Sequence, residues 1–91
     1  MVEEVQEELI GLLEEIALDD SQVVLYNDDI NTFDHVIELL MKVCKHEALQ
    51  AEQCAMLVHY KGRCVVKKGS FDKMKTIHNK LSSSGLTAEV E

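Results

Sequence analysis

Short runs of apolar, β-branched residues alternate with amphipathic stripes along most of this chain, and that alternation limits the fold more than any other feature. The run Val23–Tyr26 ends at the turn cluster Asn27-Asp28-Asp29, which predicts a buried strand that stops there. Residues 63–67 predict a second strand, and residues 86–91 alternate apolar and polar side chains as a half-buried strand does. The sequence therefore predicts a small β-sheet.

The segments between these strands have apolar residues at helical spacing. The predicted helices cover residues 33–44, 49–60 and 71–81. Asn31 or Thr32 can cap the first helix, and Ser70 can cap the third. Gly62 follows the second helix and is a plausible stop for it. Helices between strands must bury their apolar faces on the sheet.

We therefore predict an α+β fold with two layers, a three-stranded sheet with three helices on one face. A chain of 91 residues can build one compact core and is too short for two. The spacing of the strands permits either pairing direction, and antiparallel pairing is the arrangement that we expect.

The first part of the chain differs in composition from the rest. Residues 1–21 are interpreted as an N-terminal extension, and residues 22–91 as the domain. Apolar residues recur at helical spacing in the extension, and the other face is rich in glutamates. This pattern predicts an acidic amphipathic helix that packs on the domain or frays, or else a mobile tail that docks on a partner.

The charge balance excludes several classes of function. Seventeen acidic residues and nine basic ones give a formal charge of −8. A nucleic-acid binder that relies on phosphate contacts needs a basic face, and so does a protein that binds an anionic membrane surface. No apolar run reaches the roughly 18–20 residues of a transmembrane helix. We expect neither nucleic acid nor membrane as a partner.

The cysteines and the N-terminus indicate a compartment. Three cysteines are an odd number and lack the tight spacing of a disulfide scaffold, which suits a reducing environment. The first four residues, Met1-Val2-Glu3-Glu4, resemble neither a signal peptide nor a transit peptide. The expected location is the cytoplasm.

The histidines and cysteines do not form a recognisable metal or catalytic motif. Cys44 and His46 are two residues apart, and Cys54 follows eight residues later, whereas zinc sites bring ligands together in closer pairs. Buried structural thiols are the simpler interpretation. We expect no metal, no cofactor and no enzyme; a thiol enzyme that uses Cys54 or Cys64 is the alternative.

The turn cluster and a histidine near the end of the second helix can bind a cation together. Asp28 and Asp29 are acceptors when ionised, Asn27 adds a carbonyl oxygen, and the imidazole of His59 can accept a proton. The α-ammonium group of a peptide has three donors and matches such a cluster. The alternative is that the cluster is only a turn and His59 only a surface or core residue.

Three sequence blocks together resemble the ClpS family. They are Val24–Asp29 with its NDD turn, the helix Phe33–Leu40 with its Val-Ile pair, and the string Val58–Gly62, which reads VHYKG. The resemblance implies an adaptor for a bacterial AAA+ protease, a ClpA- or ClpC-type unfoldase with ClpP. Members bind the first residue of substrate proteins, usually Phe, Tyr, Trp or Leu, and hand the substrates to the unfoldase without catalysis of their own. A monomer is expected.

The resemblance also assigns roles to residues. The implied α-amino ligands are Asn27, Asp28 and His59, the turn is supported by Asp29 and Asn31, and the side-chain pocket is lined by Phe33, Val36, Ala55, Val58 and Leu86. Phe33 and Ala55 both stand where the family usually has Met, which predicts a changed order of preference among hydrophobic residues. Asn31-Thr32 replaces a usual Thr-Pro, which makes entry into the helix less rigid. The alternative is an interaction module of the same fold with a degenerate pocket, which binds an AAA+ or ribosomal partner without leading to degradation.

Overall fold

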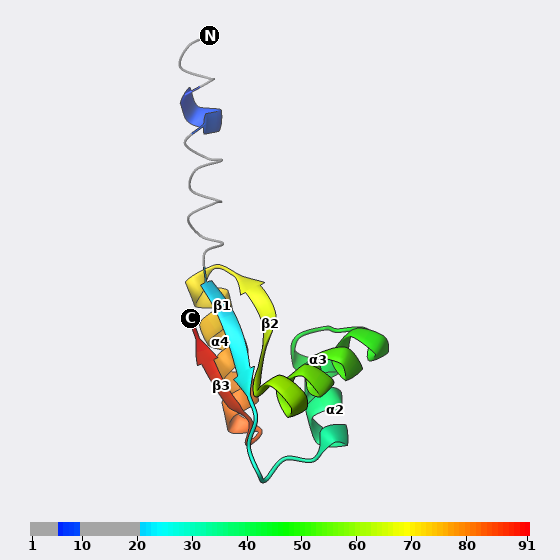
Figure 1. The fold of residues 1–91 in the computed structure, drawn as a ribbon. Coiled ribbons are helices and arrows are strands. Elements are labelled where there is room, and N and C mark those ends of the chain that lie inside the picture. The colour runs from blue at the N-terminus through cyan, green and yellow to red at the C-terminus, as the bar shows by residue number, and fades with distance from the viewer. Residues whose placement is uncertain (1–5, 10–20) are drawn as a thin grey trace.

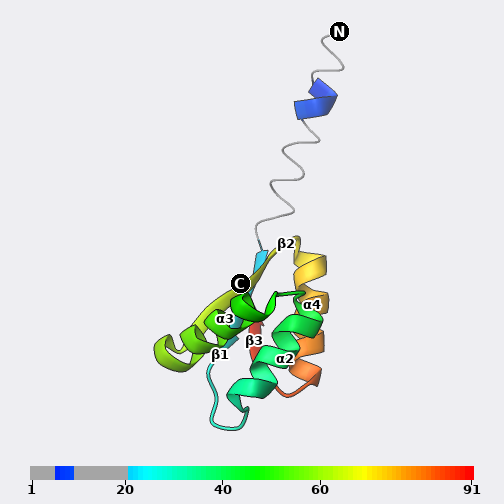
Figure 2. The ribbon, with the colours of Figure 1, turned by 90° about the vertical axis from the view of Figure 1, so that its right-hand side faces the viewer.

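The computed structural model describes residues 6–9 and 21–91, and the second range forms an α+β domain (Figure 1). Its elements in chain order are β1 (Ser21–Tyr26), α2 (Phe33–Val43), α3 (Ala48–Lys61), β2 (Arg63–Gly69), α4 (Phe71–Ser83) and β3 (Thr87–Val90). The sheet has the strand order β2-β1-β3, and both pairings are antiparallel. The helices lie together on one side of the sheet (Figure 2). The predicted fold class is confirmed.

Strand β1 lies at the centre of the sheet because its sequence is the most continuously apolar of the three strands. Val23, Val24 and Leu25 are all buried. The register between β1 and β2 shifts between Val23 and Val24, where Val66 on β2 has no partner of its own. Such a bulge lets two successive side chains of β2 depart from strict alternation.

Side chains at the helix ends set where the helices begin and stop. The Thr32 hydroxyl accepts a hydrogen bond from the His35 N–H at the start of α2, and the Ser70 hydroxyl caps α4 in the same way. Helix α3 ends at Gly62, whose φ of 88° lies in the left-handed region that favours glycine. These caps agree with the sequence pattern.

Several boundaries differ from the sequence prediction by one or two residues, and two of them have a clear physical cause. Helix α4 continues through Ser83 instead of stopping near residue 81, because the serine hydroxyls donate to carbonyls one turn back, as Ser83 does to Asn79. Strand β2 extends through Lys68 and Gly69, which the sequence assigns to a turn, because Gly69 pairs with Ser21 on β1. Tertiary pairing overrides the local turn signal at this point.

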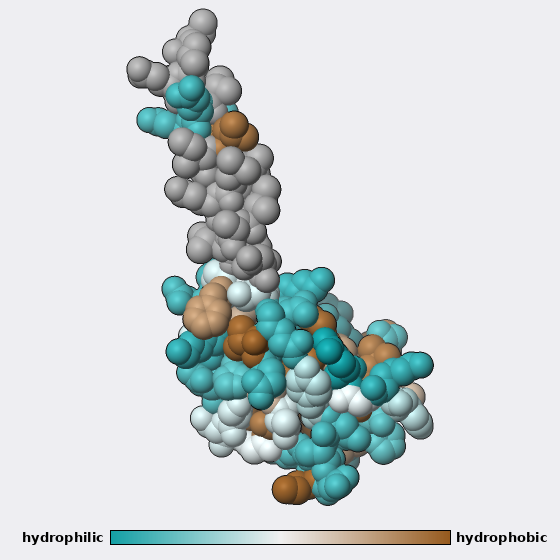
Figure 3. Space-filling view, turned by 60° about the vertical axis from the view of Figure 1, so that its left-hand side comes forward, coloured by the Kyte–Doolittle hydropathy of each residue, from teal (hydrophilic) through white to brown (hydrophobic). Residues whose placement is uncertain are grey.

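One aliphatic core joins the sheet to the helices. It includes Leu25 of β1, Leu40 of α2, Val58 of α3, Leu81 of α4 and Ala88 of β3. Cys44 and Cys54 are buried within the same cluster. Seen from the side on which β3 lies, the surface is mainly hydrophilic with isolated apolar side chains (Figure 3).

Little of the predicted N-terminal helix can be compared with the structure. Residues 6–9 are helical and exposed, and the rest of the predicted helix lies outside the described residues. Within the described ranges, no helix combines the length and the apolar character that crossing a membrane requires.

Replacement of a core leucine tests the packing of α2 in the core. Leu40 is 0% exposed and its neighbour Met41 is 40% exposed. We expect Leu40→Ala to lower the free energy of unfolding by about 2–5 kcal/mol, because it removes buried methyl groups and leaves a cavity. Met41→Ala is the matched control and should cost well under half as much. Urea unfolding followed by circular dichroism measures both; equal losses would contradict the described orientation of α2.

Candidate functional site

The candidate site lies where β1 ends, at the start of α2 and beside the last turns of α3. The N–H of Asn27 donates to the carbonyl of Gly62 at 3.0 Å, so the chain leaving β1 is tied to the end of α3. This hydrogen bond brings the turn cluster next to the helix that carries His59. A cavity of about 620 Å³ opens there. Its lining residues are Asn27, Asp28, Asp29, Asn31, Phe33, Glu52, Met56, His59 and Tyr60.

The carboxylate of Asp28 organises the turn. It accepts hydrogen bonds from the N–H groups of Ile30 and Asn31 at 2.9 and 2.8 Å, and from the Asn31 side-chain amide at 2.7 Å. The Thr87 hydroxyl donates to it at 3.3 Å from β3. Chiefly because the Asn31 N–H stabilises the ionised form, the pKa of Asp28 lies below its ordinary value of 3.8.

Asn31 extends this network to the opposite loop. Its side-chain amide nitrogen also donates to the Gly85 carbonyl at 2.8 Å, between α4 and β3. The ring Nε2 of His35 lies 3.2 Å from the neighbouring Ser84 carbonyl. The start of α2 is therefore fixed from two directions, by the turn behind it and by the loop that precedes β3.

A second, smaller hollow adjoins the polar cavity. It has a volume of about 50 Å³, and its lining residues are Asn27, Asn31, Phe33, Val36, Ala55, Val58 and His59. Val36, Ala55 and Val58 are buried, whereas Phe33 is 41% exposed at the first position of α2. The hollow thus has an apolar interior and a polar rim, and the rim residues Asn27, Asn31 and His59 are shared with the larger cavity.

The structure brings most of the predicted site residues together. Asn27, Asp28, Asp29, Asn31 and His59 line the larger cavity, and Phe33 lines both. Leu86 is the exception, because it lies buried in the core and lines neither cavity.

Residues that the sequence analysis did not assign also line the larger cavity. Glu52, Met56 and Tyr60 come from α3, and the ring of Tyr60 packs edge-on against that of His59 with centroids 5.0 Å apart. Their helical spacing of four residues, which places them on one face with His59, is the signal that could have identified them.

The charges of the larger cavity favour a cation. Asp28, Asp29 and Glu52 contribute carboxylates, and the described residues that line the cavity include no lysine or arginine. The carboxylates attract a positive group, and Asn27 and His59 add acceptors at the mouth of the apolar hollow. The arrangement suits a ligand with an ammonium group beside an apolar side chain.

The cysteines lie outside the lining of both cavities. Burial raises the pKa of the Cys44 thiol to about 11 and that of Cys64 to about 12. Both groups are therefore protonated near neutral pH, and a thiol is a poor nucleophile compared with a thiolate.

Comparisons with known proteins agree on one family. The family model described as "ATP-dependent Clp protease adaptor protein ClpS" matches residues 18–89. A ClpS adapter protein of Thermosynechococcus vestitus is 36% identical over 67 residues, which cover 72% of this chain and 71% of that protein. The E3 ubiquitin-protein ligase UBR1 of Drosophila melanogaster is 42% identical over 50 residues, 55% of this chain but only 3% of that protein.

A solved structure has the same fold. The structure of Agrobacterium tumefaciens ClpS2 bound to L-phenylalaninamide superposes with a TM-score of 0.73 at 22% sequence identity. The match covers 81% of this chain and 96% of that one.

The network around Asp28 gives stability a defined dependence on pH. Because the folded-state pKa of Asp28 is lowered, its contribution is present above the ordinary value of 3.8 and is lost as pH falls through the lowered value. We expect Asp28→Asn to lower the melting temperature at neutral pH. The difference in melting temperature between the variant and the wild type should narrow below about pH 4. Melting curves from pH 7 downward measure it. Asp29→Asn is the control, because it changes the exposed neighbouring side chain. A melting-temperature difference between Asp28→Asn and the wild type that stays constant with pH would contradict the role of the carboxylate.

Proposed function

This chain belongs to the ClpS family of adaptors of the ATP-dependent Clp protease, and we propose that it binds the free N-terminal residue of substrate proteins and delivers them to a Clp unfoldase. One observation carries the proposal: an acid-lined cavity and an apolar hollow adjoin and share Asn27, Asn31, Phe33 and His59. A single N-terminal residue has both matching parts, an α-ammonium group and a side chain that start from the same carbon atom.

The α-ammonium group binds at the shared rim. Asn27 offers an amide oxygen and His59 a ring nitrogen, and each charge-assisted hydrogen bond contributes about 1.5–3 kcal/mol. Asp28 acts in a different way, because its carboxylate already accepts four hydrogen bonds from its own surroundings. It holds the turn in place and supplies negative charge. An internal peptide nitrogen carries no charge and at most one hydrogen, so the rim selects a chain terminus.

The side chain of the N-terminal residue enters the hollow between Val36 and Val58. Its burial contributes roughly 1.5–3 kcal/mol, and ordering of the peptide opposes binding. At the upper end of these ranges, about 9 kcal/mol before the cost of ordering, the sum corresponds to a dissociation constant near the micromolar range. A hollow of about 50 Å³ is small for an aromatic ring. Phe33, partly exposed at the mouth, therefore acts as a lid that swings outward to admit Phe, Tyr or Trp.

The ligand bound to the Agrobacterium protein supports this ligand class. L-phenylalaninamide, to which that protein is bound, has a free α-amino group and an aromatic side chain and lacks a carboxylate. A phenylalanine at the start of a protein has the same three properties. Leu86 lies in the core and does not line the hollow, so we do not propose it as a contact of the ligand.

Delivery requires the unfoldase as a second partner. We propose that a ClpA- or ClpC-type unfoldase with ClpP receives the substrate in the cytoplasm and that residues 1–21 take part in the transfer. Deletion of residues 1–20 should leave peptide binding unchanged and reduce degradation of a substrate with N-terminal Phe. Reconstituted degradation with purified unfoldase and ClpP measures the effect. Loss of peptide binding in the shortened chain would make the segment part of the fold.

Acetylation of the ligand tests recognition of the terminus. A fluorescent peptide that begins with Phe should bind with near-micromolar affinity, and its N-acetylated twin should bind at least 100-fold more weakly, a difference of about 2.7 kcal/mol. Asn27→Ala and His59→Ala should weaken all hydrophobic N-terminal residues to a similar extent, and Met41→Ala, far from the rim, should not. Fluorescence anisotropy measures these affinities. Equal binding of the two peptides would favour the alternative of an interaction module that recruits an AAA+ partner without N-terminal selectivity.

The floor of the hollow determines which N-terminal residues of a ligand bind most tightly. Ala55 is buried there, and Ala55→Met adds several heavy atoms to the space that the ligand side chain must enter. We expect the variant to lose affinity for Trp- and Phe-initiated peptides more than for Leu-initiated ones, because each displaced methylene is worth about 0.8 kcal/mol. A set of five peptides that begin with Phe, Leu, Trp, Tyr and Ile measures the order. A uniform change for all five would refute the assignment of Ala55 to the floor.

A further inference from the structure

Helix α3 has small residues in the core and large apolar residues at the surface. Its buried residues are Ala51, Cys54, Ala55 and Val58. On its outer side, Met56, Leu57 and Tyr60 are 42%, 47% and 73% exposed. A single exposed apolar side chain needs no explanation, but several that gather on one face of a helix indicate contact with another molecule.

The three exposed side chains line a groove on the outer face of α3. Its volume is about 420 Å³, and its lining residues are Gln53, Met56, Leu57, Tyr60 and Lys61. Spacings of three and four residues place this set on one face of the helix. Lys61 contributes the only charge of the described lining. The groove therefore favours an apolar ligand group and repels a basic one.

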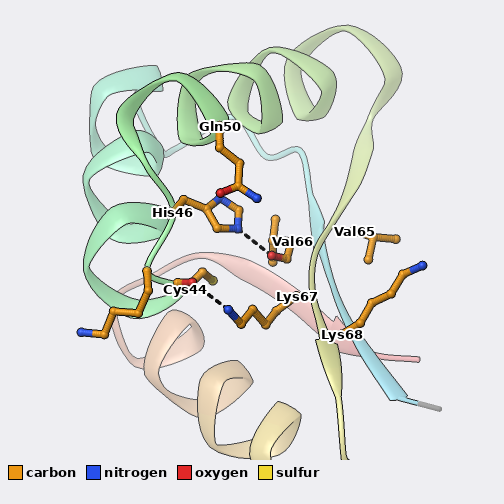
Figure 4. Close-up of a pocket in the computed structure, with 8 residues that line it drawn as sticks. Cys44, His46, Gln50, Val65, Val66, Lys67 and Lys68 are labelled. Atoms are coloured by element: carbon orange, nitrogen blue, oxygen red, sulfur yellow. Dashed lines mark hydrogen bonds between the residues drawn. The ribbon is translucent and has the colours of Figure 1, made fainter. Parts of the chain in front are cut away.

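Contacts at both ends of α3 fix the direction in which this groove faces. The helix packs mainly against α2 and β2. Just before its start, Nε2 of His46 donates to the Val66 carbonyl on β2 at 2.7 Å (Figure 4). At its end, the Asn27 N–H donates to the Gly62 carbonyl. Because both ends are held, the helix cannot rotate to bury its outer face, and the groove is a permanent feature of the surface.

The groove continues the candidate site. Met56 and Tyr60 line both the groove and the larger cavity, and the larger cavity shares His59 with the apolar hollow. Successive residues of an α-helix advance by about 100° around its axis. Ala55 in the hollow, His59 at the rim and Leu57 in the groove therefore follow one another around α3. The hollow, the larger cavity and the groove form one path across the helix.

We propose that the groove binds an apolar side chain of the substrate a few residues behind its N-terminal residue. This inference rests on the proposed function, because the N-terminal residue in the hollow fixes where the substrate chain begins. From His59 to the middle of the groove is about a third of the circumference of a helix roughly 10–12 Å across, or roughly 10–13 Å. An extended chain covers that distance with about three or four residues, so the contact falls at about the fourth or fifth residue of the substrate.

Peptides with a single leucine locate the contact. The parent peptide begins with Phe and continues with serines, and each test peptide has one leucine at the third, fourth, fifth or sixth position. We expect leucine at the fourth or fifth position to tighten binding to the full-length chain about three- to tenfold, as partial burial of its side chain implies. Lysine at the same position should bind no more tightly than serine. Fluorescence anisotropy measures the affinities.

Variants assign the gain in affinity to the groove. Leu57 lines the groove and neither cavity of the candidate site. Leu57→Ser should therefore remove most of the gain from leucine and leave the affinity for the parent peptide unchanged, which also shows that the variant is folded. Leu49→Ser is the matched control, because Leu49 is an exposed leucine of the same helix that does not line the groove. This variant should keep the full gain.

The outcomes separate this inference from the proposed function. If the parent peptide binds more tightly than its N-acetylated twin but no leucine adds affinity, the groove proposal is wrong and N-terminal recognition stands. A gain that Leu57→Ser retains would also overturn it. If Leu57→Ser leaves every peptide affinity unchanged and slows degradation, the groove contacts the unfoldase instead. Equal binding of the parent peptide and its acetylated twin would overturn both proposals.

Discussion

The hydrogen bonds that the Asp28 carboxylate accepts are the constraint on which the candidate site depends. They hold the chain between β1 and α2 in a tight turn and connect it to Thr87 on β3. Asn31 carries the same network to the Gly85 carbonyl. Without these contacts the first turn of α2 would be fixed only by its own cap and by the contact of His35 with the Ser84 carbonyl, and the turn that borders the apolar hollow would lose its support.

A second constraint positions the helix that faces this turn. The N–H of Asn27 donates to the carbonyl of Gly62, and Gly62 adopts the left-handed conformation that ends α3. His59 lies three residues before that glycine, so the end of the helix and the end of β1 meet at one point. The larger cavity thus forms between elements that are far apart in sequence, and both of its walls are anchored by backbone hydrogen bonds.

The sequence predicted the parts of the fold that depend on local patterns. The run Val23–Tyr26, the caps at Thr32 and Ser70 and the stop at Gly62 all have strong local signals, and the family resemblance from the NDD and VHY blocks is confirmed by the family match.

Features that depend on tertiary contacts could not be predicted from the sequence. The extension of β2 through Gly69 requires its partner Ser21, and the cavity-lining face of Glu52, Met56 and Tyr60 becomes visible only when α3 is placed beside the turn. The burial of Leu86 in the core is of the same kind, because a residue just before a strand can face either way.

A crystal structure of this chain with L-phenylalaninamide tests the central claim most directly. The account predicts the α-ammonium group within hydrogen-bonding distance, about 2.7–3.2 Å, of the Asn27 amide oxygen and a ring nitrogen of His59. It also predicts the phenyl ring between Val36 and Val58, with Phe33 displaced outward. A ligand bound elsewhere, or one whose amino group faces solvent, would contradict it.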